Sequence, residues 1–152
     1  TAITRTRSAL AKAGFPSRVS LHQRSHADLT AVIPKTLHQS ITAIIFNLGF
    51  LPGGDRTITT RAESTIQAMN QAVSILQPGG KLAVVAYPAH PGGGEETKAV
   101  DMWFRARNPE TCNTITHKPP SQKPTPVFFG LERFAQNQTP RTKGVDWNPH
   151  CT

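Results

Sequence analysis

The pattern of apolar positions predicts that helices and strands alternate along most of the chain. Apolar residues recur every three or four positions in segments 1–13 and 62–76, a spacing that gives a helix one apolar face. Two continuous apolar runs, 43–46 and 81–87, are typical of strands that are covered on both faces, as in parallel sheets. Weaker patterns add helices at 28–37 and from residue 95 onward, and strands at 18–23, 111–117 and 127–133.

Turn and capping residues delimit these elements. Gly14 follows the first helical segment and is expected to end it. Thr60 stands three residues before Glu63, which has the form of a capping box and predicts that the Thr60 hydroxyl caps the helix that follows. Glu95 and Glu96 suit the first turn of the last helix, because acidic side chains there oppose the helix dipole.

The order of the elements predicts an α/β domain over residues 1–133, followed by a polar, disordered tail at 134–152. Alternating helices and strands give right-handed crossovers and a mainly parallel sheet, and the last two strands suggest an antiparallel edge hairpin. Gly-rich loops at 49–55 and 88–94 each follow a predicted strand. We therefore expect both loops on the rim formed by the carboxyl ends of the strands, where such sheets bind ligands.

Composition and charge narrow the class of function. A chain of 152 residues fits one domain, and its net charge of +8 and pI near 10.2 favour a polyanionic partner, of which RNA is the commonest. A solvated basic surface or tail is the alternative.

No apolar run approaches the roughly 20 residues of a membrane span, so we expect no membrane partner. Cys112 and Cys151 form no Cys-x-x-Cys pair, so we expect no metal site and a reducing, cytoplasmic compartment.

Several sequence blocks carry a family resemblance. The turn Leu-Gln-Pro-Gly-Gly at 76–80, before a predicted strand, resembles the corresponding turn of class I methyltransferases. More specific are the block Phe-Asn-Leu-Gly-Phe-Leu-Pro-Gly-Gly-Asp at 46–55 and the block Tyr-Pro-Ala-His-Pro-Gly-Gly at 87–93. With the segments around them, from about residue 3 to residue 133, they resemble the bacterial rRNA methylase family, whose studied members are tRNA 5-aminomethyl-2-thiouridine methyltransferases.

The resemblance implies a Rossmann-like class I methyltransferase fold, with S-adenosylmethionine as cofactor and tRNA (or rRNA) as partner. The implied reaction is N-methylation of the aminomethyl group of a modified wobble uridine. Such a transfer needs a free nitrogen lone pair, with donor and acceptor held in line. Positioning of this kind contributes about 7–11 kcal/mol to lowering a barrier.

The same resemblance implies catalytic residues in the two Gly-rich loops. Asn47, at the end of a predicted strand, would orient the target amine, and Asp55 would pair with its ammonium form. His90 would take up a proton near neutral pH. Each has a structural alternative, because Asn47 and Asp55 could serve turns and His90 could be solvated or structural.

The implied binding residues surround these catalytic candidates. Ser25 and His26 follow the strand predicted at 18–23, where class I enzymes contact adenine, although the pair could also form a surface turn. The implied cofactor contacts are Ser25, His26, Asn47, Leu48 and Gly49. The implied substrate contacts are Phe50 in a base-stacking position, Pro52, Gly53, Gly54, Thr60, Gly92 and Gly93. As alternatives, Phe50 could belong to the core and the glycines at 92–94 could form a hinge.

The sequence departs from the family pattern in the part that holds the cofactor. Class I enzymes have a Gly-rich turn after their first strand and an acidic residue after their second, and neither is present here. The chain therefore resembles an N-terminally truncated member that lacks the first two strands, and we expect it to bind S-adenosylmethionine weakly or not at all. The alternatives are an inactive, truncated RNA-binding module and a methyltransferase of small molecules. A homodimer is also left open.

Overall fold

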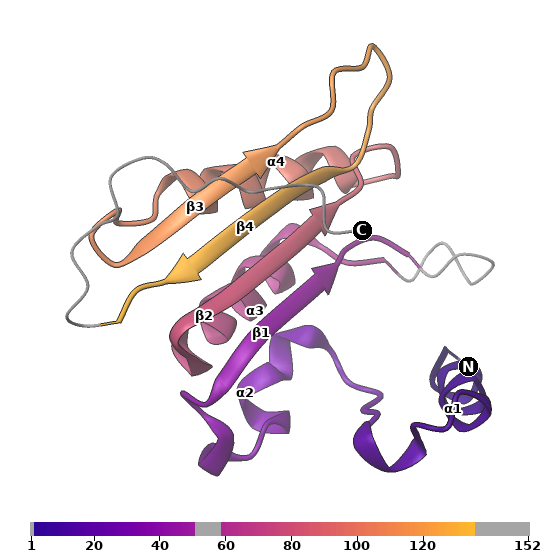
Figure 1. Ribbon diagram of the computed structural model, residues 1–152. Coiled ribbons are helices and arrows are strands. Elements are labelled where there is room, and N and C mark those ends of the chain that lie inside the picture. The colour runs from indigo at the N-terminus through magenta and orange to yellow at the C-terminus, as the bar shows by residue number, and fades with distance from the viewer. Residues whose placement is uncertain (1, 51–58, 136–152) are drawn as a thin grey trace, which may run out of the picture.

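The protein folds around a four-stranded mixed sheet with helices on one face. The computed structural model describes residues 2–50 and 59–135. β1 and β2 run parallel, whereas β4 runs antiparallel to both β2 and β3. The predicted α/β class and terminal hairpin are confirmed, but the described sheet is mixed rather than mainly parallel. The strands are β1 (Ile41–Asn47), β2 (Leu76–Ala86), β3 (Cys112–His117) and β4 (Val127–Arg133), in the order β1-β2-β4-β3 (Figure 1).

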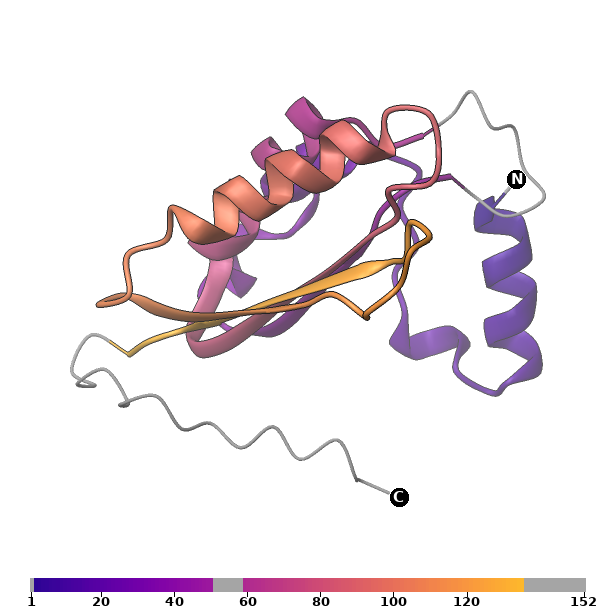
Figure 2. The same ribbon diagram turned by 90° about the horizontal axis from the view of Figure 1, so that it is seen from above.

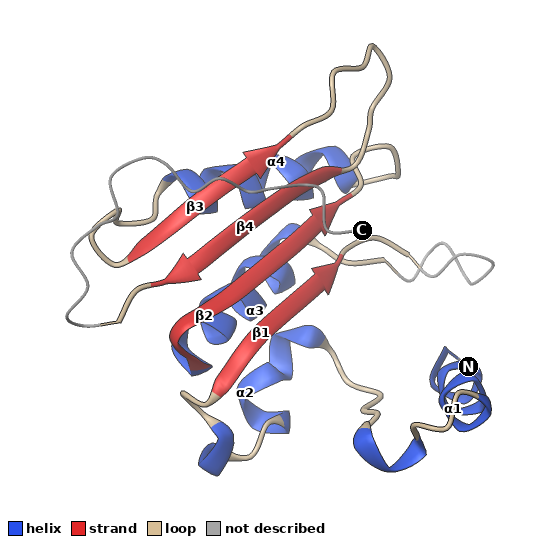
Figure 3. Cartoon of the chain, in the orientation of Figure 1, coloured by secondary structure: helices blue, strands red, loops and turns tan. Residues whose placement is uncertain are grey.

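Two longer helices cover one face of this sheet. α3 (Ala62–Ile75) connects β1 to β2, and α4 (Gly93–Arg105) follows β2. Figures 2 and 3 show both helices on the same side of the strands. The short helix α2 (Leu29–Val32) and the 3₁₀ turn η2 (His26–Asp28) pack against α3, while α1 (Ala2–Lys12) lies apart from this helical layer (Figure 1). The helices predicted at 1–13, at 62–76 and from residue 95 are confirmed.

The core lies between the helices and the covered face of the sheet. In β2 and β4 alternate residues are buried, and they meet the apolar faces of α3 and α4. The Phe104 ring of α4 stacks on Phe129 of β4 with ring centroids 5.2 Å apart. Full burial of a large apolar side chain contributes roughly 1.5–3 kcal/mol, so this layer dominates stability. The largest fully buried apolar side chains are Phe104, Phe129, Met69, Ile75, Leu76, Leu82, Val84 and Val100.

The glycines that follow α3 shape the start of β2. The pairing of β1 with β2 shifts register between Ile41 and Ala43, where the turn through Gly79 and Gly80 is taken up into the strand. A Cβ atom at Gly80 would lie 2.8 Å from the Gln77 carbonyl oxygen. Beyond this irregularity the register is regular, and it brings the carboxyl ends of β1 and β2 together.

The structure corrects two predicted elements in the N-terminal region. The strand predicted at 18–23 is wrong: Pro16–Arg18 forms a 3₁₀ turn and residues 19–23 have no regular structure. Alternating apolar residues form a strand only where a neighbour satisfies their backbone groups, and none of the described strands pairs there. The weak helix predicted at 28–37 is a single turn followed by the 3₁₀ turn Lys35–Leu37, because Pro34 cannot donate a backbone hydrogen bond.

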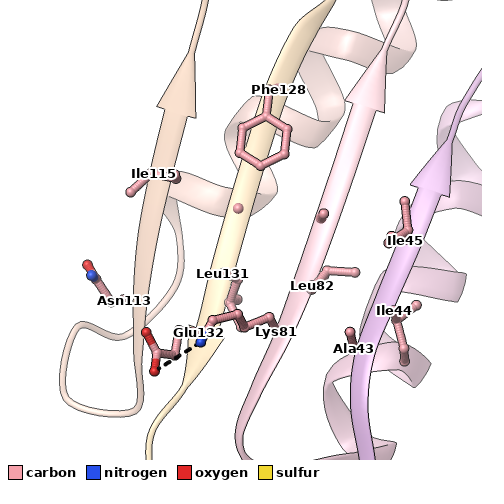
Figure 4. A pocket seen from close by; sticks show the side chains of 12 residues that line it. Ala43, Ile44, Ile45, Lys81, Leu82, Asn113, Ile115, Phe128, Leu131 and Glu132 are labelled. Atoms are coloured by element: carbon pink, nitrogen blue, oxygen red, sulfur yellow. Dashed lines mark ion pairs between the residues drawn. The ribbon is translucent and has the colours of Figure 1, made fainter. Parts of the chain in front are cut away.

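The face of the sheet opposite the helices is open among the described residues. Ile45 of β1 is 74% exposed, so the prediction that this strand is covered on both faces is wrong for the described part of the chain. A hollow of about 160 Å³ lies on this face, and Figure 4 shows Ile45, Ile115 and Phe128 among the side chains that line it. An ion pair of 3.5 Å between Lys81 and Glu132 crosses one end of it.

The predicted tail begins with two described residues. The Phe134 amide donates to the Thr111 carbonyl oxygen across 2.8 Å, which extends the pairing at the end of β4. The rest of the predicted tail, residues 136–152, lies outside the described residues.

Candidate active site

A cavity lies at the carboxyl ends of the two parallel strands. Its volume is about 340 Å³. Register pairing of Asn47 with Val85 sets the ends of β1 and β2 side by side, so the segments that follow them meet there. The prediction that the two Gly-rich loops share a rim is confirmed for their described residues. The cavity is lined by Asn47, Leu48, Gly49, Phe50, Tyr87, Ala89 and His90.

Asn47 presents a free amide to this cavity. It is the last residue of β1, and its side chain is exposed and makes no hydrogen bond to the described residues. The next residue, Leu48, donates its N–H to the Val85 carbonyl oxygen across 2.9 Å, and its side chain joins the hydrophobic core. The backbone at the strand end is therefore fixed, while the Asn47 amide is available to a ligand.

Residues 48–50 are held in place by the segment that leads into α3. Phe50 forms an antiparallel bridge with Thr59, and the Thr60 N–H donates to the Gly49 carbonyl oxygen across 3.1 Å. The Gly49 N–H in turn donates to the Thr60 hydroxyl across 2.8 Å. The predicted capping box is therefore wrong, because α3 begins at Ala62 without a side-chain cap and the Thr60 hydroxyl is engaged elsewhere.

The buried carboxyl group of Glu96 holds this arrangement together. Its Oε2 accepts a hydrogen bond of 2.7 Å from the Thr60 hydroxyl, and its Oε1 accepts one of 2.6 Å from the Thr65 hydroxyl. Glu96 is 1% exposed and Thr65 is 0% exposed. The first turn of α4 is thereby tied both to α3 and, through Thr60, to the backbone of Gly49.

This hydrogen-bond network was not predicted from the sequence, although the sequence contains one signal of it. Glu96 was expected to act on the helix dipole, and it does lie in the first turn of α4. It also precedes Val100, Trp103 and Phe104 at helical spacing, which places it on the buried face of that helix. A carboxyl group on an apolar face requires buried donors, and the hydroxyls of Thr60 and Thr65 supply them.

His90 packs the second loop against the first. Its Nδ1 lies 2.9 Å from the Pro91 carbonyl oxygen, which can only accept, so Nδ1 carries a hydrogen and the lone pair of a neutral ring is on Nε2. Nε2 is buried without a partner among the described residues, and the ring meets Phe50 edge-on at 6.0 Å between centroids. A Cβ atom at Gly49 would lie 3.5 Å from Nε2, so this nitrogen faces the Gly49 backbone.

The glycines at the start of α4 permit this packing. A Cβ atom at Gly93 would lie 2.3 Å from the Tyr87 carbonyl oxygen and 2.8 Å from the His90 ring. Gly92 has a φ of +78°, a left-handed conformation that favours glycine. The Gly93 N–H donates to the His90 carbonyl oxygen across 2.8 Å, so it is already engaged. The substrate contacts expected of Gly92 and Gly93 stay predictions.

Ser25 and His26 lie outside the cavity lining. The Ser25 hydroxyl accepts from the Ala27 N–H across 3.2 Å and begins the turn η2. His26 is half-buried, with its ring edge-on to Phe46 at 6.0 Å and its Nε2 3.4 Å from the Thr65 hydroxyl oxygen. Burial lowers the pKa of His26, while the negative charge of Glu96 and a hydrogen bond to the Ser64 backbone oppose that shift. The adenine contacts expected of Ser25 and His26 stay predictions.

Other candidates have separate outcomes. Pro52, Gly53, Gly54 and Asp55 lie outside the described residues. Cys112 lies in the edge strand β3, and burial raises the pKa of its thiol, which disfavours a nucleophilic thiolate. Within residues 2–50 and 59–135, no group of three His, Cys, Asp or Glu side chains is placed to hold a metal ion.

Tyr87 also lines the cavity and was not predicted from the sequence to do so. Tyr87 directly follows β2, two residues beyond Val85, the register partner of Asn47, and it is exposed at the cavity. Its position immediately after a buried strand and before the loop with His90 was a usable signal.

Comparison with known proteins identifies the family. Residues 1–132 match the model of the family described as "Putative rRNA methylase". The chain belongs to this rRNA methylase family. The fold of the chain, with its mixed sheet, matches that of class I S-adenosylmethionine-dependent methyltransferases.

Three relatives illustrate the family. A protein of Arabidopsis thaliana named tRNA (mnm(5)s(2)U34)-methyltransferase, chloroplastic, is 37% identical over 85 residues, which are 56% of this chain and 30% of that protein. The crystal structure of a "putative rRNA-methylase" from Clostridium thermocellum has 29% identity and a TM-score of 0.81. That of a "putative methyltransferase" from Streptococcus mutans in complex with SAH has 25% identity and a TM-score of 0.77. Each structural match covers 88% of this chain and 70% of the other chain.

The chain thus spans 30% of the length of the Arabidopsis relative. In the described part of the rRNA methylase chain, no helix is long and apolar enough to cross a membrane. The cytoplasmic compartment and the homodimer stay predictions.

Proposed function

We propose that this chain carries the substrate-facing part of an RNA methyltransferase that uses S-adenosylmethionine to N-methylate the aminomethyl group of a modified wobble uridine in tRNA. The cavity at the ends of β1 and β2 carries the proposal, because it combines the free amide of Asn47 with the rings of Phe50 and Tyr87. Family membership and the name of the Arabidopsis relative support the choice of reaction.

The cavity fits the acceptor nucleoside better than it fits the whole cofactor. Its described lining contains amide, aromatic and imidazole side chains but no carboxyl group that could accept hydrogen bonds from ribose hydroxyls. S-adenosylmethionine, when bound, supplies an electrophilic methyl group. Asn47 and Gly49 are the described lining residues that we expect at the methyl-bearing end of the cofactor, since they stand where β1 meets the cavity.

Asn47 and the two aromatic rings can position the acceptor. An amine reacts through its lone pair, so its N–H groups must be held by acceptors that leave the lone pair free. The Asn47 amide oxygen is an acceptor of this kind, because it is exposed at the cavity and makes no hydrogen bond to the described residues. Stacking of the base on Phe50 or Tyr87 would contribute about 1–3 kcal/mol to binding.

His90 and Glu96 complete the proposed site in different ways. Nε2 of His90 is a buried acceptor next to Gly49, and it would take the proton that leaves the ammonium group if the Gly49 backbone moves aside. The hydrogen bonds of Glu96 go to the hydroxyls of Thr60 and Thr65, neither of which lines the cavity, and Glu96 positions Gly49 through Thr60. We therefore assign Glu96 a positioning role.

An RNA-binding module without chemistry is the second candidate. One observation favours it: the described lining of the cavity contains no carboxyl group that could bind the ribose hydroxyls of the cofactor. Both candidates require RNA binding, and only the first requires methyl transfer.

Transfer of a labelled methyl group separates the two candidates. The full chain is incubated with excess methyl-labelled S-adenosylmethionine and a tRNA that carries 5-aminomethyl-2-thiouridine at the wobble position. The control is the same tRNA with unmodified uridine there. Label in the modified tRNA alone is the expected result. Equal labelling of both tRNAs would contradict the amine as acceptor, and no labelling of a bound tRNA would favour the module.

A further inference from the structure

A second, larger cavity lies between α4 and the segment that connects β3 to β4. Its volume is about 630 Å³. The connecting segment, residues 118–126, extends beyond the sheet as the orange loop at the top of Figure 1. We call this cavity the basic groove, after the four cationic side chains that line it: Lys98, Arg105, Lys118 and Lys123.

The basic groove carries uncompensated positive charge. Asp101 is its acidic lining residue, and this carboxylate is already paired with Arg105 across 2.7 Å. The remaining lysines, Lys98, Lys118 and Lys123, are exposed and form no ion pair with the described residues. Three unpaired cations around one hollow raise the local concentration of anions. A ligand with several negative charges therefore suits this groove.

The basic groove and the proposed active site share one turn. Pro88 lines the groove, while its neighbours Tyr87 and Ala89 line the cavity at the ends of β1 and β2. A ligand that fills the cavity with one group can therefore continue across this turn into the groove. An RNA strand has this form, because each base is attached to a backbone with one negative charge per nucleotide.

From these observations we infer that the basic groove binds the phosphodiester backbone of the RNA strand next to the nucleotide held in the cavity. The inference rests on the proposed function for the class of partner. Lys98 of α4 and Lys118 and Lys123 of the connecting segment would contact successive phosphates from two sides of the groove. An acidic protein segment is less suited, since it brings no base for the cavity that adjoins the groove.

The test compares two triple variants of the full chain that have the same net charge. K98Q/K118Q/K123Q removes the unpaired cations of the groove. K12Q/R24Q/K35Q removes three exposed cations that do not line it. Binding of a fluorescently labelled anticodon stem-loop RNA is measured by anisotropy over a series of salt concentrations, and circular dichroism verifies that both variants fold.

The groove variant should bind about tenfold more weakly at low salt, and the slope of log affinity against log salt should flatten by about two, because each lost phosphate contact in single-stranded RNA removes about 0.7. The remote variant should keep the wild-type slope. Equal flattening in both variants would overturn the inference, and so would competition by poly-glutamate as effective as competition by unlabelled RNA.

The RNA-binding measurement on the two triple variants does not depend on methyl transfer. A chain that binds RNA through the groove but transfers no methyl group at saturating S-adenosylmethionine contradicts the proposed function and leaves the groove assigned. A chain that methylates tRNA with an unchanged KM in the K98Q/K118Q/K123Q variant contradicts the groove alone.

Discussion

The carboxyl group of Glu96 accepts a hydrogen bond from the Thr65 hydroxyl across 2.6 Å in the interior of the domain, where both residues are almost fully buried. The bond joins the first turns of α3 and α4. The other oxygen of the same carboxyl group engages Thr60, which fixes Gly49 at the cavity. One buried side chain thereby links the packing of the helices to the position of the candidate active site.

Removal of this carboxyl group should weaken the whole domain. Glu96→Ala leaves the hydroxyls of Thr60 and Thr65 without their acceptor, and we expect the free energy of unfolding to fall by about 3 kcal/mol in urea titrations. Glu95→Ala is the matched control, because Glu95 is exposed in the same turn, and it should change stability by less than about 0.5 kcal/mol. Equal effects of the two substitutions would contradict the role assigned to Glu96.

A milder variant isolates the link to the cavity. Thr60→Val removes the hydroxyl that accepts from the Gly49 N–H, and it should cost about 1–2 kcal/mol. Hydrogen exchange should accelerate at the Gly49 amide more than at the Leu48 amide, which is bonded to Val85. Unchanged protection of Gly49 would show that Thr60 does not hold this backbone.

Two adjacent glycines of α4 should respond in opposite directions to the same substitution. Gly93→Ala places a Cβ atom against the Tyr87 carbonyl oxygen and the His90 ring, and it should destabilise the protein by about 1–3 kcal/mol. Gly94→Ala meets no atom within 4 Å, and it should stabilise by about 0.5–1 kcal/mol. Thermal unfolding of the two variants measures both changes. A neutral Gly93→Ala would contradict the close packing of the loop with His90.

Stability should fall as the pH drops through the titration range of His26. Burial lowers the pKa of this imidazole in the folded state, so the unfolded chain takes up the proton first, near pH 6.5. The contribution of neutral His26 is therefore present above about pH 6.5 and is lost below it. Urea midpoints between about pH 7.5 and 5.5 should fall less steeply for His26→Gln than for His22→Gln, since His22 is exposed. Parallel pH profiles of these two variants would contradict the prediction.

The sequence predicts correctly those helices and strands whose own pattern of apolar residues is enough to identify them. β1, α3 and β2 are of this kind, since continuous runs and helical spacing identify them without knowledge of neighbours. The strand predicted at 18–23 fails because an alternating pattern cannot reveal that no strand lies beside it. The predicted cap at Thr60 fails because the N–H of Gly49, 11 residues away, donates to the hydroxyl oxygen that was expected to accept from the helix.

In the candidate site, too, the features with a local sequence signal were predicted and those that depend on distant residues were not. The rim formed by Asn47 and the loop with His90 was predicted, because strand ends and glycine-rich loops are local signals. The contributions of Tyr87 and Glu96 depend on which residues the folded chain brings together, and the local pattern gave at most an indication of them.

Asn47 offers the sharpest mutational test of the site. Its amide makes no hydrogen bond to the described residues, so Asn47→Ala should leave stability within about 0.5 kcal/mol of the wild type. If the amide holds the acceptor amine, kcat/KM for tRNA methylation should fall by about 10- to 100-fold. Asn113→Ala, on the open face of the sheet, is the control and should methylate at the wild-type rate. An Asn47→Ala protein of wild-type activity would remove Asn47 from the mechanism.

The most direct test of the central claim is an NMR titration of the full chain with the nucleoside 5-aminomethyl-2-thiouridine, because it locates the acceptor without requiring methyl transfer. The amide signals of Gly49, Phe50, Tyr87 and His90 should shift together, and 2-thiouridine without the aminomethyl group should shift them less. Shifts confined to the open face of the sheet, around Ile45 and Phe128, would contradict the assignment of the acceptor site to the ends of β1 and β2.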